Sequence, residues 1–356
     1  MKQPFDKIIG NEQVKRYLTQ VVKKNAIGNS LLFTGIDGIG KSLFAENFAK
    51  LMLNVDTLQH PDIHIYRPEG KLGMHSIDSM RHMCEKVYLA PFSANRKVFI
   101  IHHAEKMLPS SSNSLLKTFE EPSLDSVIIL ISSNSRALLP TVLSRCRAIR
   151  FHHLELDEIK NFLIKNYGKA EMEATQIASL SGGSIGKAVQ LASNESDLIR
   201  KEVMELLAKG KLKLYADIVS ASQKISQLVE EVKKQEEASI KSLTIKGYED
   251  LTAAQLHSFT KEVEGAVSMK QSSFAHSIFE QILSWYRDLG LLKCGADINF
   301  LINPDYIEPL RHSLKAQNPL PIESVQKMIS EAKLLLERST SLNIVLENLF
   351  LKLGLI

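Results

Sequence analysis

Residues 35–42 have the residue types and spacing of a phosphate-binding loop: a glycine, four residues, and then Gly-Lys-Ser. Glycines let backbone N–H groups curve around phosphate oxygens, Lys41 can reach the outer phosphates, and the Ser42 hydroxyl can bind magnesium. The flanks fit, because residues 30–34 predict a buried strand and residues 42–50 predict a helix whose N-terminal end favours an anion. A glycine-rich turn without a ligand is the alternative. We therefore expect ATP or ADP, with magnesium at Ser42, to bind at Gly35, Asp37, Gly38, Ile39, Gly40, Lys41 and Ser42.

The acidic pair that nucleotide hydrolysis needs is missing from its expected place. Such an enzyme uses an Asp to hold magnesium and a Glu to polarise the attacking water, at the end of a neighbouring strand. The best candidate strand, residues 97–101, is followed by His102 and His103 instead. Imidazole is a poor ligand for the hard magnesium ion. The sequence thus predicts a degenerate site that holds a nucleotide and cleaves it slowly, if at all. The alternative is hydrolysis with His103 as the base or with a displaced carboxylate such as Glu105.

The two adjacent histidines could instead bind a transition metal. Neighbouring strand residues point to opposite faces, which disfavours binding of one ion by both. The three cysteines, Cys84, Cys146 and Cys294, lie far apart and predict neither a disulfide framework nor a zinc site.

The bulk composition is that of an ordinary globular protein with room for two or three domains. The chain has 356 residues, 44% of them hydrophobic and 24% charged, and a formal charge of +4. That charge permits contact with nucleic acid without arguing for it. No apolar run approaches a membrane span, and the first residues carry no signal-peptide stretch. We expect a cytoplasmic protein.

The pattern along the chain predicts three domains. Residues 1–155 alternate strands and helices, which indicates an α/β domain with a parallel sheet covered by helices. Residues 156–208 predict short helices around a loop at 181–187, and residues 209–356 are helical throughout, with apolar stripes at 214–232 and 342–353. The predicted strands are 30–34, 63–66, 97–101, 127–132 and 148–151, and the predicted helices of the first domain are 12–24, 42–53, 76–88 and 111–120.

These pieces, in this order, resemble the bacterial clamp-loader branch of the AAA+ ATPases. Residues 5–12 are similar to the family's opening segment, which lines the adenine pocket, and residues 113–122 match its helix after the second Walker strand. Asn134 stands at the position of the first sensor. Residues 144–146 form the Ser-Arg-Cys motif of clamp loaders, with Arg145 at its centre. The resemblance is clearest over residues 5–150.

The resemblance implies a P-loop domain over 1–155, a small helical lid over 156–208 and a helical collar over 209–356. It also implies partners: the gamma/tau and delta subunits in a five-subunit ring, a sliding clamp, and primed DNA reached through the complex. In this family the arginine of Ser-Arg-Cys enters the neighbour's nucleotide site, where it neutralises charge on the transferred phosphate. The alternative for Arg145 is an ordinary surface salt bridge.

Departures from the family pattern indicate which kind of subunit this is. Beside the two histidines, the lid loop has Gly186 where an arginine second sensor is expected, with Lys187 next to it. The family's four-cysteine zinc module is absent, and no tail follows the collar, so we do not expect the long tau form. An intact trans arginine with a failed hydrolysis site resembles the delta-prime subunit, a stator with absent or very weak ATPase activity. A gamma/tau-type ATPase motor is the alternative. An unrelated P-loop kinase would leave Ser144-Arg145-Cys146 unexplained.

Overall fold

The computed structural model describes residues 5–70, 72–192, 194–245, 253–316, 318–338 and 340–355. The chain forms two compact units, each with its own buried apolar core. Unit 1 contains Met1–Gln190 and Asp250–Ser268, and unit 2 contains Leu191–Glu249 and Met269–Ile356.

Unit 1 is built on a parallel sheet with the strand order β2-β3-β4-β1-β5. Leu32 of β1 lies opposite Leu130 of β4, and Phe99 of β3 lies opposite Ile128 of β4. The strands are β1 Ser30–Thr34, β2 Ile63–Tyr66, β3 Lys97–Ile101, β4 Ser126–Ser132 and β5 Arg147–Arg150.

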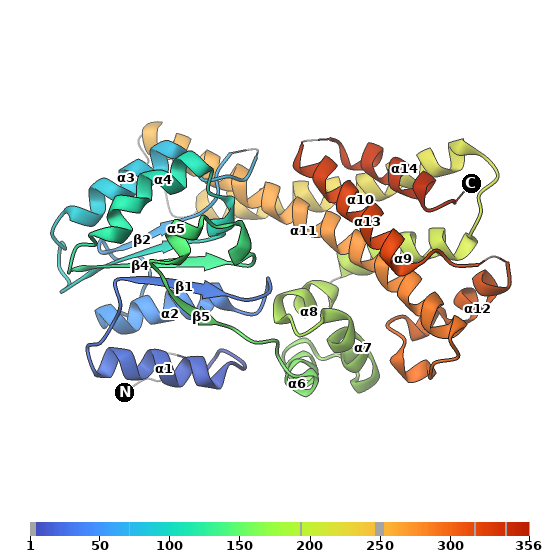
Figure 1. Ribbon diagram of the computed structural model, residues 1–356, viewed down its shortest axis with the longest axis horizontal. Helices are drawn as coiled ribbons and strands as arrows, with labels where there is room; N and C mark the ends of the chain where they lie inside the picture. The colour runs from blue at the N-terminus through green and yellow to red at the C-terminus, as the bar shows by residue number, and fades with distance from the viewer. Residues whose placement is uncertain are drawn as a thin grey trace. The chain divides into compact units, whose positions relative to one another are not determined.

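Helices cover both faces of this sheet, as Figure 1 shows. Side chains at alternate strand positions enter two different cores, because successive strand residues point to opposite faces. Phe33 and Ile129 pack toward α1 and α2, whereas Leu32 and Ile128 pack toward α3, α4 and α5. Burial on both faces explains why the central strands are continuous apolar runs. The helices are α1 Glu12–Lys23, α2 Lys41–Leu53, α3 Ile77–Tyr88, α4 Pro109–Glu120 and α5 Pro140–Leu143.

This architecture confirms the predicted α/β P-loop domain. The predicted strands and helices of residues 1–155 all occur, with ends that differ by one or two residues. The loop at 35–40 joins β1 to α2, so the predicted phosphate-binding loop lies at the carboxyl end of a central strand. In open parallel sheets, this edge is where ligands bind.

Three short helices follow β5 within unit 1: α6 Leu156–Tyr167, α7 Glu171–Ser181 and α8 Ile185–Leu191. A capping box between Glu155 and Glu158 begins α6, and Gly168, in the left-handed conformation, ends it. Ile159 and Leu163 of α6 are fully buried. These helices fall within residues 156–208, the range predicted to form a lid, and are called the lid below.

Part of the region expected to be collar belongs to unit 1. The Gly70 N–H group donates to the Lys261 carbonyl at 2.9 Å, close to the start of α11 Ala253–Lys293. At Gly265, an added Cβ would lie 2.1 Å from the Pro68 carbonyl oxygen, so only glycine allows this approach of the two backbones. The beginning of α11 therefore packs on the loop that follows β2, a long-range contact that helix periodicity could not reveal.

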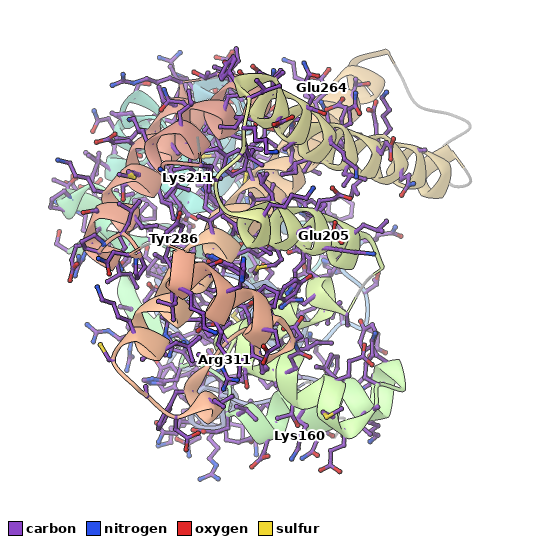
Figure 2. The ribbon with its side chains drawn as sticks, turned by 90° about the vertical axis from the view of Figure 1, so that its right-hand side faces the viewer. Lys160, Glu205, Lys211, Glu264, Tyr286 and Arg311 are labelled. Carbon is purple, nitrogen blue, oxygen red and sulfur yellow. The ribbon has the colours of Figure 1, made fainter. Side chains whose placement is uncertain are left out.

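Unit 2 is helical around a core that includes Trp285. The buried Asp288 carboxylate accepts hydrogen bonds from the backbone N–H groups of Ile302 and Asn303, which fixes the chain beyond α11. The Tyr286 hydroxyl, labelled in Figure 2, donates to the Leu353 carbonyl. Besides the second part of α11, the unit contains α9 Asn194–Lys209, α10 Tyr215–Ile245, η3 Ile298–Phe300, η4 Pro304–Tyr306, α12 Ile307–Ala316, α13 Ile322–Glu337 and α14 Leu342–Lys352.

Helix α9 lies in unit 2, whereas the sequence analysis assigned residues up to 208 to the lid. The apolar side chains Ile199, Val203 and Met204 of α9 are buried in the core of unit 2. Apolar residues at helical spacing predict that a helix face is buried, but not which other helices it packs against. The predicted boundary at residue 208 therefore lies after α9, whereas the structure places the boundary before it. From Ile218 onward the stripe of α10 is buried or partly buried, as expected, but Leu214 precedes the helix and is 63% exposed. In the ranges described, no helix combines the length and the apolar character that crossing a membrane requires.

Candidate nucleotide site

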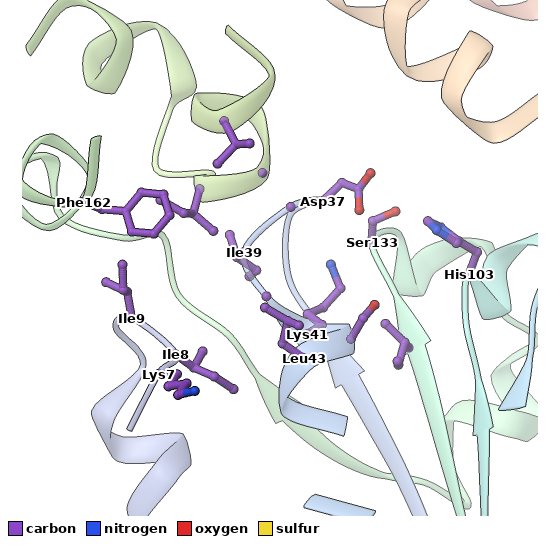
Figure 3. Close-up of a pocket in the computed structure, with 17 residues that line it drawn as sticks. Lys7, Ile8, Ile9, Asp37, Ile39, Lys41, Leu43, His103, Ser133 and Phe162 are labelled. Carbon is purple, nitrogen blue, oxygen red and sulfur yellow. The ribbon is translucent and has the colours of Figure 1, made fainter. Parts of the chain in front are cut away.

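A cavity of about 400 Å³ lies between the phosphate-binding loop and the lid, within unit 1. Figure 3 shows Ile8, Ile9 and Phe162 at one end of it, and Asp37 and Ser133 at the other. An apolar end suits an aromatic base, and a polar end beside a helix N-terminus suits phosphates. The cavity thus has the two halves that a nucleotide requires, and residues 7–9 line it within the segment predicted to form the adenine pocket.

The loop itself contributes backbone donors and one buried cation. Gly38 and Gly40 have φ of 74° and 93°, a left-handed conformation that side-chain-bearing residues rarely adopt. Helix α2 begins at Lys41, and no side chain caps it at Gly40, so its first N–H groups face the cavity end. Lys41 Nζ donates to the carbonyls of Gly35 and Ile36 at 2.8 and 2.7 Å. Burial lowers the pKa of Lys41, opposed by the charges of Asp37 and Glu105.

Most of the loop residues expected to bind nucleotide line the cavity. Asp37, Gly38, Ile39, Gly40, Lys41 and Ser42 do so, whereas Gly35 is not among the described lining residues. Gly35 sits at the base of the loop, where an added Cβ would lie 2.7 Å from the Phe151 carbonyl oxygen. Gly35 allows the chain to turn at the end of β1. Its carbonyl accepts a hydrogen bond from Lys41 Nζ.

His102 lies directly beneath the loop, at the end of β3. Its Nδ1 is 3.2 Å from the Ser42 hydroxyl, and its side chain is almost completely buried. Burial, together with the charge of Arg67, lowers the pKa of His102 to about 3, so the ring is neutral at physiological pH. The ring therefore occupies the place beside Ser42 where a hydrolase of this class needs a carboxylate.

His103 lines the cavity (Figure 3). The Glu105 carboxylate lies next to it. The backbone of His103 is left-handed, with φ of 49°, which turns the chain into the single turn η1 Ala104–Lys106. The Glu105 Oε1 atom is 3.5 Å from His103 Nδ1 and accepts a hydrogen bond from Ser133 Oγ at 2.7 Å. Burial opposes ionisation of Glu105, but the hydrogen bonds from His103 and Ser133 prevail and lower its pKa to about 2. A carboxylate thus holds the imidazole beside the polar end of the cavity.

Asn134, the expected first sensor, is exposed and is not among the described residues that line the cavity. Its backbone N–H donates to Ser132 Oγ, and η2 Ser135–Ala137 follows it. Ser133 lines the cavity instead and binds Glu105. The sequence analysis identified the right strand end but not which of its polar residues faces inward.

The lid loop rests on the phosphate-binding loop by direct hydrogen bonds. Ser184 Oγ donates to the Asp37 carbonyl at 2.8 Å, and the Gly186 N–H donates to the Gly38 carbonyl at 2.8 Å. A Cβ added at Gly186 would lie 2.9 Å from Gly38 Cα, closer than real Cβ atoms come. No side chain, and so no sensor arginine, fits at this position in the observed arrangement. Sequence reasoning noticed Gly186 as a departure but could not foresee this contact.

Arg145 is on the surface, outside the cavity of its own chain. It follows the short helix α5, and its guanidinium donates to the Thr141 carbonyl at 2.9 Å and to Glu120 Oε1 at 2.6 Å. The side chain is one-third exposed. These contacts hold the arginine in place and leave one side of it open to solvent.

Within the described residues, no group of three or more His, Cys, Asp or Glu side chains is arranged to bind a metal ion. The cysteines Cys84, Cys146 and Cys294 are free. The donor set beside Ser42 is a nitrogen of His102, which does not match the oxygen ligands that magnesium prefers.

The parallel sheet, the loop at 35–42 and the adjoining helices form a P-loop α/β domain, the architecture that the resemblance to AAA+ proteins implies. A model of the family described as DNA polymerase III, delta subunit, matches residues 10–155. The DNA polymerase III subunit delta' of Bacillus subtilis is 28% identical over 200 residues, which are 51% of this chain and 59% of that protein.

Two further relatives are subunits of the same polymerase from other bacteria. Subunit delta' of Pseudomonas aeruginosa is 33% identical over 135 residues, 33% of this chain and 41% of that protein. Subunit gamma/tau of Mycoplasma pneumoniae is 25% identical over 222 residues, 57% of this chain and 32% of that protein. These matches support a similarity to DNA polymerase III clamp-loader subunits over the first part of the chain, which spans less than two thirds of the length of each of these relatives. Because the chain resembles both delta' and gamma/tau proteins, these similarities do not distinguish between the two kinds of subunit.

Proposed function

We propose that this chain is a delta-prime-type subunit of a DNA polymerase III clamp loader that acts as a stator. In this role it binds ATP or ADP, hydrolyses it very slowly or not at all, and supplies Arg145 to the nucleotide site of a neighbouring ATPase subunit. Its partners are gamma/tau and delta subunits in a five-subunit ring in the cytoplasm. The ring places a sliding clamp on primed DNA.

The observation that carries the proposal is the position of His102. The ring fills the place next to Ser42 that an acidic residue must occupy for hydrolysis, and it is buried there. Arg145 supports the second half of the proposal, because it lies at the surface outside the cavity and is held by Glu120. A fixed, permanently charged guanidinium suits bidentate contact with a phosphate.

Steady-state ATP hydrolysis by the isolated chain tests the stator role. We expect no turnover above that of the Lys41→Ala variant, which removes the cation of the loop. Turnover at the rates of a typical motor ATPase, lost in Lys41→Ala, would show that the chain is itself an ATPase.

A gamma/tau-type motor is the second candidate, and one observation favours it. Glu105 lies beside His103, which faces the cavity. A carboxylate that orients an imidazole is an arrangement suited to a general base. If the chain is a motor of this kind, Glu105→Gln and His103→Ala should each abolish turnover. If it is a stator, neither change has turnover to remove.

A further inference from the structure

The Ser42 hydroxyl, which the P-loop pattern assigns to magnesium, is in contact with an imidazole that the fold holds firmly. The backbone N–H of His102 donates to the Tyr66 carbonyl at 2.9 Å, and its carbonyl accepts a hydrogen bond from His75 Nε2 at 2.7 Å. His75 is itself completely buried. The backbone of His102 is therefore fixed on both sides, and burial of the side chain keeps its ring beside Ser42.

The other ring nitrogen of His102 contacts no anion closely. Nε2 has no hydrogen-bond partner among the described residues, and the Glu46 Oε1 atom is 3.9 Å away. Glu46 Oε1 also lies 3.5 Å from Arg67 Nη2, with which it forms an ion pair. An imidazole carries no negative charge, so it can neither attract a dication nor hold its bound waters as a carboxylate does.

Glu105 does not replace the missing carboxylate beside Ser42. Its Oε1 accepts from Ser133 Oγ and lies 3.5 Å from His103 Nδ1, and its buried Oε2 has no hydrogen-bond partner among the described residues, so neither oxygen is bonded to Ser42. Among the described residues, no group of three or more His, Cys, Asp or Glu side chains is arranged to hold a metal ion. The residues present therefore do not fit a magnesium ion.

The phosphate-binding parts of the site do not depend on a metal. Lys41 supplies a buried positive charge, and α2 begins there without a side-chain cap, so backbone N–H groups remain to bind oxygens. We infer that the site takes a nucleoside di- or triphosphate free of divalent metal, and that magnesium adds nothing to its affinity. This inference rests on the nucleotide binding in the proposed function and specifies the form of the ligand.

The test is the titration of the full chain with fluorescent analogues of ATP and ADP, in millimolar magnesium chloride and in excess EDTA. We expect the two Kd values to agree within about twofold, because magnesium gains no protein ligand. Lys41→Ala should abolish binding in both conditions. Binding that is about tenfold tighter in magnesium would overturn the inference while leaving nucleotide binding intact. If saturable binding were absent both in magnesium and in EDTA, the inference and the nucleotide-binding part of the proposed function would both be overturned.

Restoring a carboxylate provides the complementary test. His102→Asp places an oxygen ligand beside Ser42, and we expect it to bind the ATP analogue more tightly in magnesium than in EDTA. The matched control is His102→Asn, which is similar in shape to Asp but uncharged and should remain indifferent to magnesium. Circular dichroism checks that both variants fold. If His102→Asn gained the same dependence as His102→Asp, the charge argument would be wrong. If His102→Asp does not fold, the wild-type titration in EDTA decides.

Discussion

At the scale of single residues, the replacement of an acidic pair by two histidines has two different consequences. His102 is buried against Ser42, whereas His103 faces the cavity beside Glu105. The alternation of strand residues predicted that the two rings would diverge. What the sequence could not give is the left-handed turn at His103, which depends on the local fold and brings Glu105 back toward the site.

Arg145 is the residue through which this chain would act on another. We predict that Arg145→Ala leaves folding and assembly intact, because an exposed ion pair with Glu120 contributes at most about 1 kcal/mol. In a reconstituted complex the variant should slow hydrolysis at one nucleotide site by about 10³-fold or more, and clamp loading with it. Clamp-loading and ATPase rates of the assembled ring measure this.

Arg136→Ala is the matched control, because Arg136 is an exposed arginine in the neighbouring turn η2. It should leave both rates unchanged. If Arg145→Ala also left them unchanged in a fully assembled ring, Arg145 would be an ordinary surface residue.

The buried His102 makes a prediction about pH. Its pKa is about 3 in the folded chain and near 6.5 when unfolded, so below 6.5 the unfolded state binds the additional proton. The contribution of His102 to the free energy of unfolding is fully present above pH 6.5 and is lost progressively as the pH falls toward 3. Between pH 7 and pH 5 this single group should lower the free energy of unfolding by about 2 kcal/mol.

Urea unfolding at the two pH values checks this expectation in wild type and in His102→Asn, which cannot titrate. The variant should lose about 2 kcal/mol less than wild type over the same interval. The matched control is His82→Asn, an exposed histidine on α3 that should leave the pH dependence as it is. Equal losses in wild type and His102→Asn would mean that the His102 ring is solvated in the folded chain.

At the scale of elements, the local pattern determined most of what was predictable. The strands of unit 1 are apolar runs of strand length and its helices carry clear apolar stripes, so both could be located to within a residue or two. Contacts between distant segments could not be found in this way. Three such features depend on the packed structure. They are the contact of Gly186 with Gly38, the close approach of Gly265 to Pro68, and the fact that Ser133 rather than Asn134 lines the cavity.

The lid contact makes a prediction at this scale. We expect Gly186→Ala to lower the free energy of unfolding of unit 1 by about 1–3 kcal/mol, because the new Cβ would overlap Gly38 Cα, a backbone atom that cannot move aside. Hydrogen exchange of residues 182–190 should increase as the lid detaches. Thermal unfolding together with hydrogen exchange measures both effects.

Gly290→Ala is the control, since an added Cβ there meets nothing within 4 Å and helix propensity favours alanine. It should be neutral or slightly stabilising. Unchanged exchange at 182–190 in Gly186→Ala would show that the lid is not seated on the loop in solution.

At the scale of the whole molecule, we propose that the two units have different roles, nucleotide binding in unit 1 and assembly in unit 2. Unit 1 contains the cavity and Arg145, and unit 2 is a helical body with its own core. The sequence analysis placed a domain boundary after residue 208, where a cut would separate the predicted P-loop domain and lid from the predicted collar. Because α9 buries Ile199, Val203 and Met204 in unit 2, a cut there would leave these apolar side chains without their core.

We therefore predict that a truncated chain ending at Gln190, the last residue of the first stretch of unit 1, is more soluble and better folded than one ending at residue 208. Exposure of the apolar face of α9 should make the longer fragment aggregate. The shorter one also loses the contact of Gly70 with Lys261, so it should be somewhat less stable than unit 1 in the intact chain.

If the second unit drives assembly, neither fragment should co-purify with partner subunits that retain the full chain. Size-exclusion chromatography and co-purification measure these outcomes, and recovery of the 1–190 fragment in the ring as efficiently as the full chain would rule out the proposed role of unit 2 in assembly.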